Sequence, residues 1–166
     1  MQEKLYGGRF EAGQDKYFEK FSESLHFDKR LIEADLEGSK AFARALESVG
    51  ILNAEERGRI VKAFEEIQTE AKNSAYFNGA SDEDVHSFVI RQLKEKTGEL
   101  ADKIHTGRSR NEQVSLDTRL WLRSTIETTI TATKSLMAEL LKLANKYPQA
   151  VIPGYTHMRR AQAVLW

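Results

Sequence analysis

The chain has 166 residues, enough for one ordinary domain or for a small domain followed by part of another. Its 25 basic and 25 acidic residues balance, so its charge favours neither nucleic acid nor an anionic membrane as a partner. The absence of cysteine excludes disulfides and thiolate chemistry, and it fits a cytoplasmic protein. No apolar run is long enough to cross a bilayer, and no signal peptide is visible. Only 2 prolines and 30% charged residues favour a helix-rich protein.

Residues 1–27 are expected to be the least regular part of the chain. Gly7 and Gly8 interrupt any long helix, so the sequence predicts an irregular arm laid on something else. Asp28 is a plausible helix N-cap. Ser24 and Asp28 lie at this transition, where one interpretation is that both side chains merely satisfy a turn.

The first long helix is predicted over residues 29–49. Its apolar residues mostly keep helical spacing, and Gly50 is a natural stop. The members of this stripe are Ile32, Leu36, Phe42, Leu46 and Val49. Gly38, within the helix, costs about 1 kcal/mol relative to alanine. It therefore indicates that another segment packs closely there.

Two further helices follow in the sequence. Asn53 and Glu56 have the spacing of a capping box, and the helix after them carries a second apolar stripe. Ser81 and Asp84 form another candidate capping box, and Gly98 is expected to end the third helix. Three carboxylates would then lie in the first turn of that helix, where the dipole favours them: Asp82, Glu83 and Asp84. We expect the apolar stripes to be core and not a cofactor site.

Residues 105–111, His-Thr-Gly-Arg-Ser-Arg-Asn, contain no aliphatic side chain. Such a run is not expected in a core, because each buried polar group would need a partner. One interpretation is a solvated, charged turn. The other is an anion site, because a helix N-terminus attracts anions and arginine grips carboxylate or phosphate with two parallel hydrogen bonds.

A very long helix is predicted over residues 112–146, which contain neither glycine nor proline. At 1.5 Å per residue it would be about 50 Å long. Helices of this length usually belong to bundles or coiled coils. Pro148 and Pro153 then break the chain, and Thr156 is expected to begin a further helix that runs to Trp166.

Two segments resemble a known family. Residues 105–111, with the Glu112-Gln113-Val114 that follows, resemble the first signature of the argininosuccinate lyase family in the fumarase/aspartase superfamily. Residues 153–157, Pro-Gly-Tyr-Thr-His, with the later Arg160-Ala161-Gln162, resemble the second signature. The departures are modest, such as Glu112 where the family usually has aspartate.

The resemblance implies an all-α fold. Residues 1–110 would form a small N-terminal helical domain, and residues 111–166 would begin a central helical bundle. The family's third signature, a Gly-Ser-Ser loop ending in Met-Pro-Gln-Lys-Lys-Asn-Pro, does not occur in the sequence. We therefore expect a fragment of a longer homotetrameric enzyme, inactive alone and self-associating through its long helix.

The family reaction is the reversible cleavage of argininosuccinate to arginine and fumarate, which serves arginine biosynthesis. It needs a proton acceptor, a proton donor and groups that hold the developing dianion. His157 is the expected catalytic residue, either removing the carbon proton or assisting the leaving group. The substrate-binding residues implied are Ser24, Asp28, His86, Arg108, Ser109, Arg110, Asn111 and Thr156. His86 also has a structural interpretation, which is the usual one for a lone histidine.

Two alternatives stay open. Another superfamily enzyme, such as an adenylosuccinate lyase, would share the bundle and the second segment. A non-catalytic structural relative of the delta-crystallin type is also compatible with an intact Thr156 and His157. No cofactor is expected, and no metal is expected because the 4 histidines lack zinc-ligand spacing.

Overall fold

The computed structural model describes residues 15–166, which divide into two compact units, one ending at Trp121 and the other spanning Leu122–Trp166. The helices, with 3₁₀ helices written η, and the strands are α1 (Lys16–Ser22), α2 (Leu25–Asp28), η1 (Lys29–Leu31), α3 (Ile32–Ser48), α4 (Ala54–Glu70), η2 (Ser74–Phe77), α5 (Val85–Thr97), η3 (Gly98–His105), α6 (Arg110–Lys146), β1 (Val151–Thr156) and β2 (Arg159–Leu165). The all-α class is thus confirmed, with one small two-stranded sheet added among the described residues. None of the described helices combines the length and the apolar character that crossing a membrane requires.

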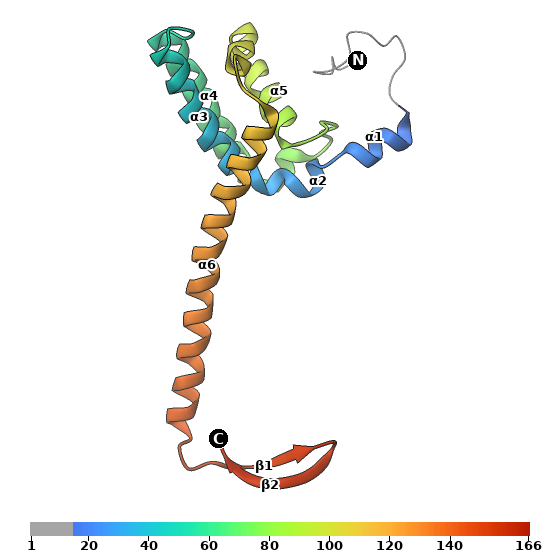
Figure 1. Ribbon diagram of the computed structural model, residues 1–166, viewed down its shortest axis with the longest axis vertical. Helices are drawn as coiled ribbons and strands as arrows, with labels where there is room; N and C mark the ends of the chain where they lie inside the picture. Colours follow the sequence, from blue (N-terminus) through green and yellow to red (C-terminus); the bar gives the residue numbers. More distant parts are fainter. Residues whose placement is uncertain (1–14) are drawn as a thin grey trace. The chain divides into compact units, whose positions relative to one another are not determined.

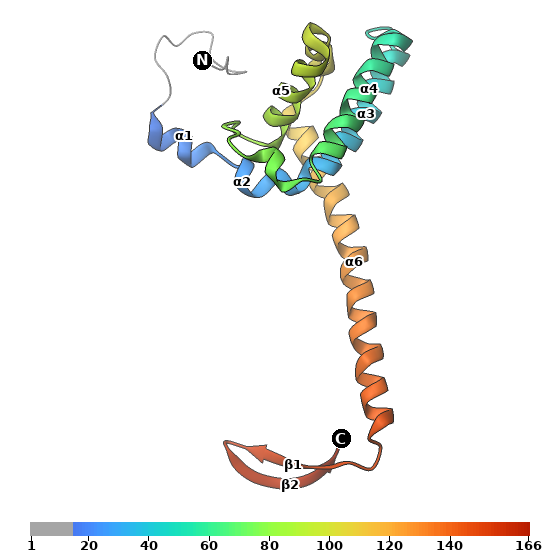
Figure 2. The same ribbon diagram turned by 180° about the vertical axis from the view of Figure 1, so that it is seen from behind.

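The first unit is built on the packing of α3, α4 and α5. Helices α3 and α4 lie side by side in both views of the ribbon (Figures 1 and 2). The predicted stripes form its core, where Leu36, Ile60 and Phe64 are fully buried. Val49 is the exception at 70% exposure, because it is the C-cap of α3 and lies beyond the packed turns.

The predicted helix ends at Asn53, Gly50 and Gly98 are confirmed. The predicted N-cap at Asp28 is wrong, because Asp28 ends α2 and its side chain caps neither η1 nor α3. Asn53 and Glu56 form a reciprocal capping box, with bonds of 2.8 and 3.0 Å between each side chain and the other residue's backbone N–H. Gly50 and Gly98 follow α3 and α5 with φ angles of 79° and 64°, a region that favours glycine.

The predicted capping box at Ser81 is wrong. Helix α5 begins at Val85, and its N-cap is Asp84, whose carboxylate accepts a 2.7 Å hydrogen bond from the Ser87 N–H. The three carboxylates therefore precede the helix instead of occupying its first turn. Asp82 is instead hydrogen-bonded to the Arg91 guanidinium along the side of α5.

The predicted irregular arm is partly helical. Residues 16–22 form α1, because Asp15 caps the helix by accepting from the Tyr17 and Phe18 backbone N–H groups. Helix α1 buries none of its own residues. Gly7 and Gly8, on which the prediction rested, lie outside the described residues.

The close approach predicted at Gly38 is confirmed. A Cβ placed there would lie 3.2 Å from Leu116 Cδ2 and 3.4 Å from Asp117 Oδ1. Both residues belong to the early turns of α6, so glycine lets α6 pack directly against α3.

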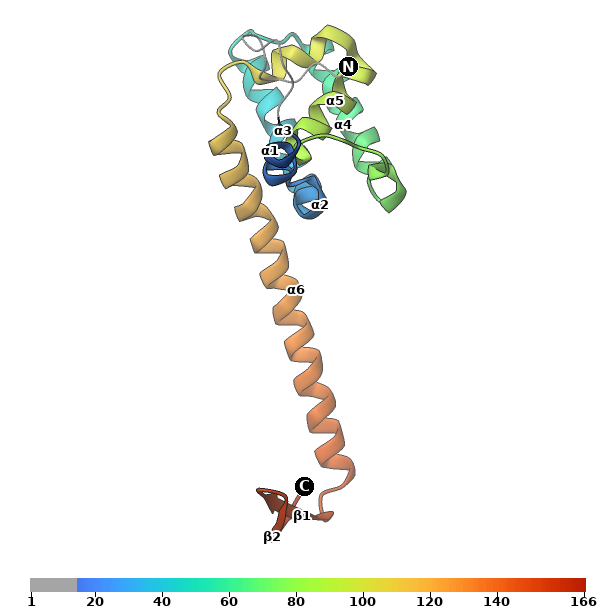
Figure 3. The ribbon, with the colours of Figure 1, turned by 90° about the vertical axis from the view of Figure 1, so that its right-hand side faces the viewer.

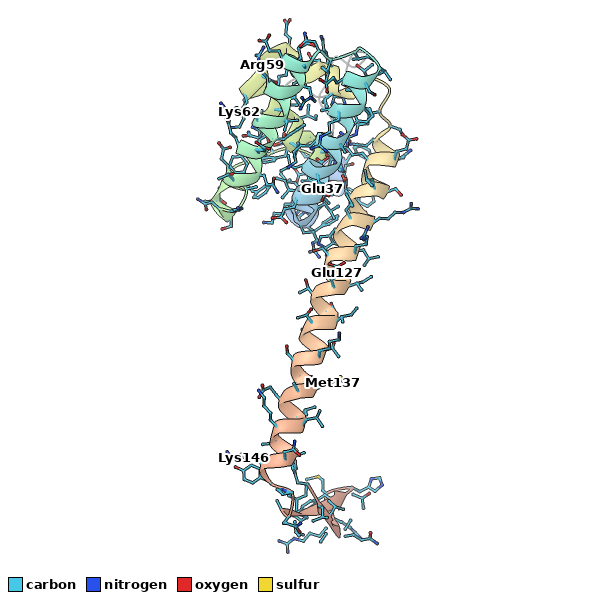
Figure 4. The ribbon with its side chains drawn as sticks, turned by 90° about the vertical axis from the view of Figure 1, so that its left-hand side faces the viewer. Glu37, Arg59, Lys62, Glu127, Met137 and Lys146 are labelled. Carbon is cyan, nitrogen blue, oxygen red and sulfur yellow. The ribbon has the colours of Figure 1, made fainter. Side chains whose placement is uncertain are left out.

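Helix α6 is continuous over 37 residues (Figure 3), two residues longer at its start than predicted. Beyond Trp121 its larger apolar side chains are mostly about half exposed or more, including Ile126 at 48% and Met137 at 57%. Figure 4 shows side chains projecting from this part, with Glu127 and Met137 labelled. Four threonine hydroxyls in this stretch donate to the backbone carbonyl one turn earlier, those of Thr128, Thr129, Thr131 and Thr133.

The expected helix after Thr156 is wrong, because residues 151–165 form an antiparallel hairpin. Its β-branched and aromatic residues suit strands, and Pro153 is tolerated because both strands are edges. The turn residues His157 and Met158 have φ angles of 48° and 62°, which match a tight two-residue turn. Gly154 is required, because a Cβ there would lie 2.6 Å from the Gln162 carbonyl oxygen.

Candidate functional site

Polar residues of the first unit gather where α2, α5 and the start of α6 come together. The Asp28 carboxylate accepts hydrogen bonds from the Val85 N–H at 3.1 Å and from the Ser24 hydroxyl at 2.6 Å. The Ser24 backbone N–H donates to the Glu83 carbonyl at 2.7 Å. Burial raises the pKa of Asp28, and the bonds from Ser24 and Val85 offset part of that rise.

Ser24 and Asp28 therefore join α2 to the N-terminus of α5, and their predicted contacts with substrate stay predictions. A carboxylate has about four acceptor positions, so these two bonds leave Asp28 able to accept more.

Arg110 is the first residue of α6 and holds that helix to α5. Its Nη2 donates to Asp84 Oδ1 at 2.9 Å and to the Ser87 hydroxyl at 2.9 Å. The side chain keeps 23% of its surface exposed. These bonds use two of the five N–H groups of a guanidinium. Arg110 is therefore fixed in position while still able to contact an anion.

Asn111 and Ser109 flank Arg110 and are exposed. An open, shallow hollow lies along the first turns of α6, lined by Asn111, Glu112, Ser115, Leu116 and Arg119. Ser109 accepts the Gln113 backbone N–H at 3.1 Å through its carbonyl oxygen, so it precedes the helix as expected.

Arg108 lies in a different environment from the rest of the polar run. Its side chain is only 7% exposed, and its Nη1 donates to the Ser39 hydroxyl at 2.9 Å. The guanidinium also lies over the Phe42 ring, 5.1 Å from its centroid. The expectation that the whole run avoids the interior is wrong at this position, because α3 supplies both a hydroxyl and an aromatic face.

Beneath these residues lies a fully buried group made of Asp35 on α3, His86 on α5 and Asp117 on α6. His86 Nδ1 is 3.3 Å from Asp35 Oδ2 and 3.5 Å from Asp117 Oδ2. The other Asp35 oxygen, Oδ1, accepts from Ser39 at 3.1 Å and from the Gln113 amide. Both Asp117 oxygens, Asp35 Oδ2 and His86 Nδ1 lack a hydrogen-bond partner with good geometry. We refer to Asp35, His86 and Asp117 as the buried triad.

The pKa values in the buried triad are strongly perturbed. Burial disfavours the charged form of His86, but the Asp35 carboxylate outweighs burial and raises the pKa of His86. For Asp35 burial is likewise outweighed, chiefly by His86, and its pKa lies below its usual range. Burial and the neighbouring Asp35 raise the pKa of Asp117 to about 7. The triad therefore competes for protons near neutral pH.

The triad also has the dimensions of a cation site. One donor atom from each of its three residues lies within 4.8 Å of the others. Two carboxylates and one imidazole are a donor set that divalent metals accept. The expectation of no metal rests on histidine spacing alone, and that spacing does not include Asp35 and Asp117.

Sequence reasoning missed Asp35 and Asp117 entirely. Asp35 lies three residues after Ile32, and Asp117 lies three residues after Val114, each one helical turn from an apolar position. A charged residue at core spacing was the available sign, because such a residue is rarely buried without a partner. His86 lies at 2% exposure within this group, so its observed contacts are with other side chains of the chain.

Thr156 and His157 belong to the second unit. Thr156 ends β1 and pairs with Arg159, and His157 is the first residue of the hairpin turn. Both side chains are exposed.

The comparison with protein families covers nearly the whole chain. A family described as "Lyase" matches residues 8–166, and the chain belongs to it. Among curated relatives, an argininosuccinate lyase of Solibacter usitatus (strain Ellin6076) is 63% identical over 98% of this chain and 35% of its own length. One of Alteromonas mediterranea (strain DSM 17117 / CIP 110805 / LMG 28347 / Deep ecotype) is 42% identical over 96% of this chain and 35% of its own length. The chain thus spans about a third of the curated relatives it matches.

Proposed function

We propose that this chain is the N-terminal part of an argininosuccinate lyase, which cleaves argininosuccinate to arginine and fumarate in arginine biosynthesis. The observation that carries the proposal is the 63% identity to an argininosuccinate lyase over nearly the whole chain. In this chain the first polar motif lies at the start of a helix, and the second lies at a hairpin turn. We further propose a cytoplasmic homotetramer.

The chemistry assigned to the chain's residues follows the elimination. A base removes a proton from the carbon beside a carboxylate, and the guanidinium leaves from the neighbouring carbon. Arg110 and Asn111, supported by Ser109, would hold succinyl carboxylates, which suits a guanidinium already held at a helix N-terminus. Asp28 would face the positive guanidinium of the substrate, where a half-buried carboxylate binds a cation well.

His157 and Thr156 would complete this part of the reaction. An imidazole can accept or donate a proton near neutral pH, so His157 suits acid–base work at the reacting carbon or nitrogen. The Thr156 hydroxyl would donate to a substrate carboxylate. The remaining partner acid or base would come from a segment beyond these 166 residues. Arg108 and His86 would support the site from within, since their observed contacts are internal.

The proposal is tested by following fumarate absorbance in the ultraviolet with the complete protein and argininosuccinate as substrate. His157→Ala should lower turnover by about 10²–10⁴-fold, the usual contribution of general acid–base catalysis. Circular dichroism should show an unchanged fold, because the His157 side chain is exposed. Release of fumarate from adenylosuccinate but not argininosuccinate would assign a different superfamily enzyme. A folded parent that releases none from either substrate would favour a structural protein.

Arg110→Lys tests the anion site in the same assay. Lysine keeps the charge but loses the planar fork that contacts Asp84 and Ser87 together. Loss of a charge-assisted hydrogen bond costs about 1.5–3 kcal/mol. KM should therefore rise by about 10- to 150-fold, from that range of free energy. Kinetics like those of the parent would show that Arg110 is only a surface charge.

A further inference from the structure

The buried triad holds two carboxylates and one imidazole away from water. We propose that at neutral pH His86 is a buried cation shared by Asp35 and Asp117, and that this charge positions the first turns of α6, and with them Arg110, for anion binding. The claim about the charge stands on the described contacts. The claim about anion binding rests on the proposed function.

Electrostatics favours a proton on His86 Nδ1, although neither nearby carboxylate oxygen is aligned for a hydrogen bond with it. This atom faces carboxylate oxygens from two different helices, at 3.3 and 3.5 Å. A nitrogen lone pair at this position would repel both oxygens, whereas an N–H attracts both. Each residue of the triad is at most 2% exposed, so water cannot screen the carboxylates from each other.

Charge balance favours a cationic imidazole as well. The facing charges on the packed elements are Asp28 from α2, Asp84 and Arg110, which bond each other, and Arg108. Arg108 lies 3.9 Å from Asp35 Oδ1 and is the guanidinium nearest the triad. It neutralises one of the two triad carboxylates, so one negative charge is left over. An uncompensated buried charge is very costly, and an imidazolium removes it.

Two other arrangements could also balance the charge. A proton on Asp117 would restore neutrality, but it would leave Asp35 with only the more distant Arg108 as a counter-charge. A divalent metal bound by the triad would leave one excess positive charge if only Arg108 is counted and none if Asp28 is counted as well, so metal binding has to be tested directly. A proton on His86 instead forms an ion pair with both carboxylates at once.

The triad acts on the same turns of α6 that carry the anion-binding residues. Asp117 lies two turns after Arg110, and Gln113, between them, donates to Asp35. Asp84, which accepts from Arg110, lies two residues before His86 at the start of α5. Loss of the cation would therefore loosen α6 from both α3 and α5. His86 is a positioning residue in this scheme and does not contact substrate.

The first experiment locates the proton by ¹⁵N NMR of the imidazole rings in the 166-residue chain. Both ring nitrogens of His86 should give cationic shifts at neutral pH, with the exposed His26 as a reference in the same spectrum. In Asp117→Asn the loss of one counter-charge should move the His86 transition to lower pH. The control Asp82→Asn removes a carboxylate that pairs with Arg91 and should leave His86 unchanged.

The same spectra can overturn the proposal. A neutral His86 in the parent, unaffected by Asp117→Asn, would place the proton on Asp117, since asparagine mimics a protonated aspartate. Stoichiometric Zn²⁺ binding that shifts the His86 resonances and is lost in Asp117→Asn would make the triad a metal site instead.

The second experiment compares variants by urea unfolding. His86→Gln leaves the triad with one excess negative charge and should be strongly destabilised. Adding Asp117→Asn restores neutrality, so the double variant should be more stable than His86→Gln alone. If the stability losses of the two single variants simply add up in the double variant, His86 and Asp117 do not share a charge. If His86→Gln does not fold, the double variant must still fold and the Asp117→Asn spectrum still decides.

The dependence of stability on pH gives an independent check. The raised pKa of His86 contributes stability that is complete below about 6.5 and is lost as pH rises through the folded value. The pKa of Asp117, about 7 instead of 3.8, makes stability fall in the same direction between those values. His105, whose pKa is lowered by burial and by Arg110 and Arg108, acts oppositely and is retained in every variant. In the double variant, stability should no longer fall with rising pH as it does in the parent. A fall that persists in the double variant would show that the triad is not its source.

The positioning role is tested by kinetics in the complete protein. His86→Gln should lower kcat/KM by about 10²-fold, as a small misplacement of a binding group does. The change should appear mainly in KM, because Arg110 contacts a carboxylate present before and during the reaction. Adding Asp117→Asn should recover part of the loss. A loss confined to kcat would instead assign His86 to the chemical step. An inactive parent would defeat the proposed function while the NMR result still tests the charge.

Discussion

The two units use the same apolar periodicity with opposite results. In the first unit, residues at helical spacing such as Leu36, Ile60 and Phe64 are completely buried. In the second, Ile126, Ile130 and other apolar residues of α6 at the same kind of spacing remain about half exposed. Periodicity therefore predicts a helix and its apolar face correctly in both regions. Periodicity does not predict which segment covers that face, because the covering segment is distant in the sequence.

The largest effect should come from covering the apolar face of α6. Complete burial of a large apolar side chain contributes about 1.5–3 kcal/mol, so four half-exposed ones would contribute on the order of 3–6 kcal/mol. We expect the 166-residue chain to self-associate through this face, as measured by sedimentation equilibrium over a range of concentrations. Ile130→Asp should weaken association. Thr128→Asp, two residues away and on the opposite side of the helix, should not.

That comparison fails if the parent is a monomer at every concentration. An equal effect of both aspartate variants would show that net charge, and not the apolar face, controls association.

The next largest effect should be a difference in stability loss when an apolar residue is truncated in the first unit and in the second. Phe64→Ala removes a fully buried ring and should lower the free energy of unfolding by about 3–5 kcal/mol. Ile126→Ala, at a 48% exposed position, should change it by about 0.5 kcal/mol or less. Urea denaturation of dilute protein, where association is weakest, measures both. A loss at Ile126 close to that at Phe64 would mean that α6 is covered after all.

Two helical glycines give a smaller, sharper contrast within the first unit. Gly38→Ala pushes a methyl group against α6 and should cost about 1–3 kcal/mol, the usual range for overpacking. Gly58→Ala meets nothing within 4 Å and should instead stabilise α4 by about 0.5–1 kcal/mol. Thermal unfolding of the pair measures the difference. Stabilisation by both substitutions would show that Leu116 yields easily and that α6 is loosely packed on α3.

Sequence was most informative where local chemistry decides structure. The Asn53–Glu56 capping box, the stops at Gly50 and Gly98 and the apolar stripes all depend on residues a few positions apart. Gly38 was informative about tertiary structure, because a glycine inside a helix needs a packing reason. From these features α3, α4 and α5 can be predicted without knowing any distant contact.

The failures share a dependence on distant partners or on unusual local conformations. The hairpin was missed because its turn has His157 and Met158 at positive φ, where Asn-Gly or Asp-Gly is the usual sign. Arg108 is buried because Ser39 and Phe42 happen to face it from α3. The buried triad brings together residues up to 82 positions apart, Asp35 and Asp117, and local spacing can indicate that each is buried but not that they meet. The roles of Thr156 and His157 stay predictions.

The threonine hydroxyls of α6 change what it costs to remove water from this helix. Thr128, Thr129, Thr131 and Thr133 already donate to backbone carbonyls one turn earlier, at 2.8–3.0 Å. Dehydrating a hydroxyl is expensive mainly when its hydrogen is left without an acceptor. These positions can therefore sit at a dry boundary as readily as at a wet one. The threonine-rich part of α6 looks too polar for the interior of a bundle, yet it is compatible with one. Its threonines therefore broaden the range of surfaces against which α6 can pack.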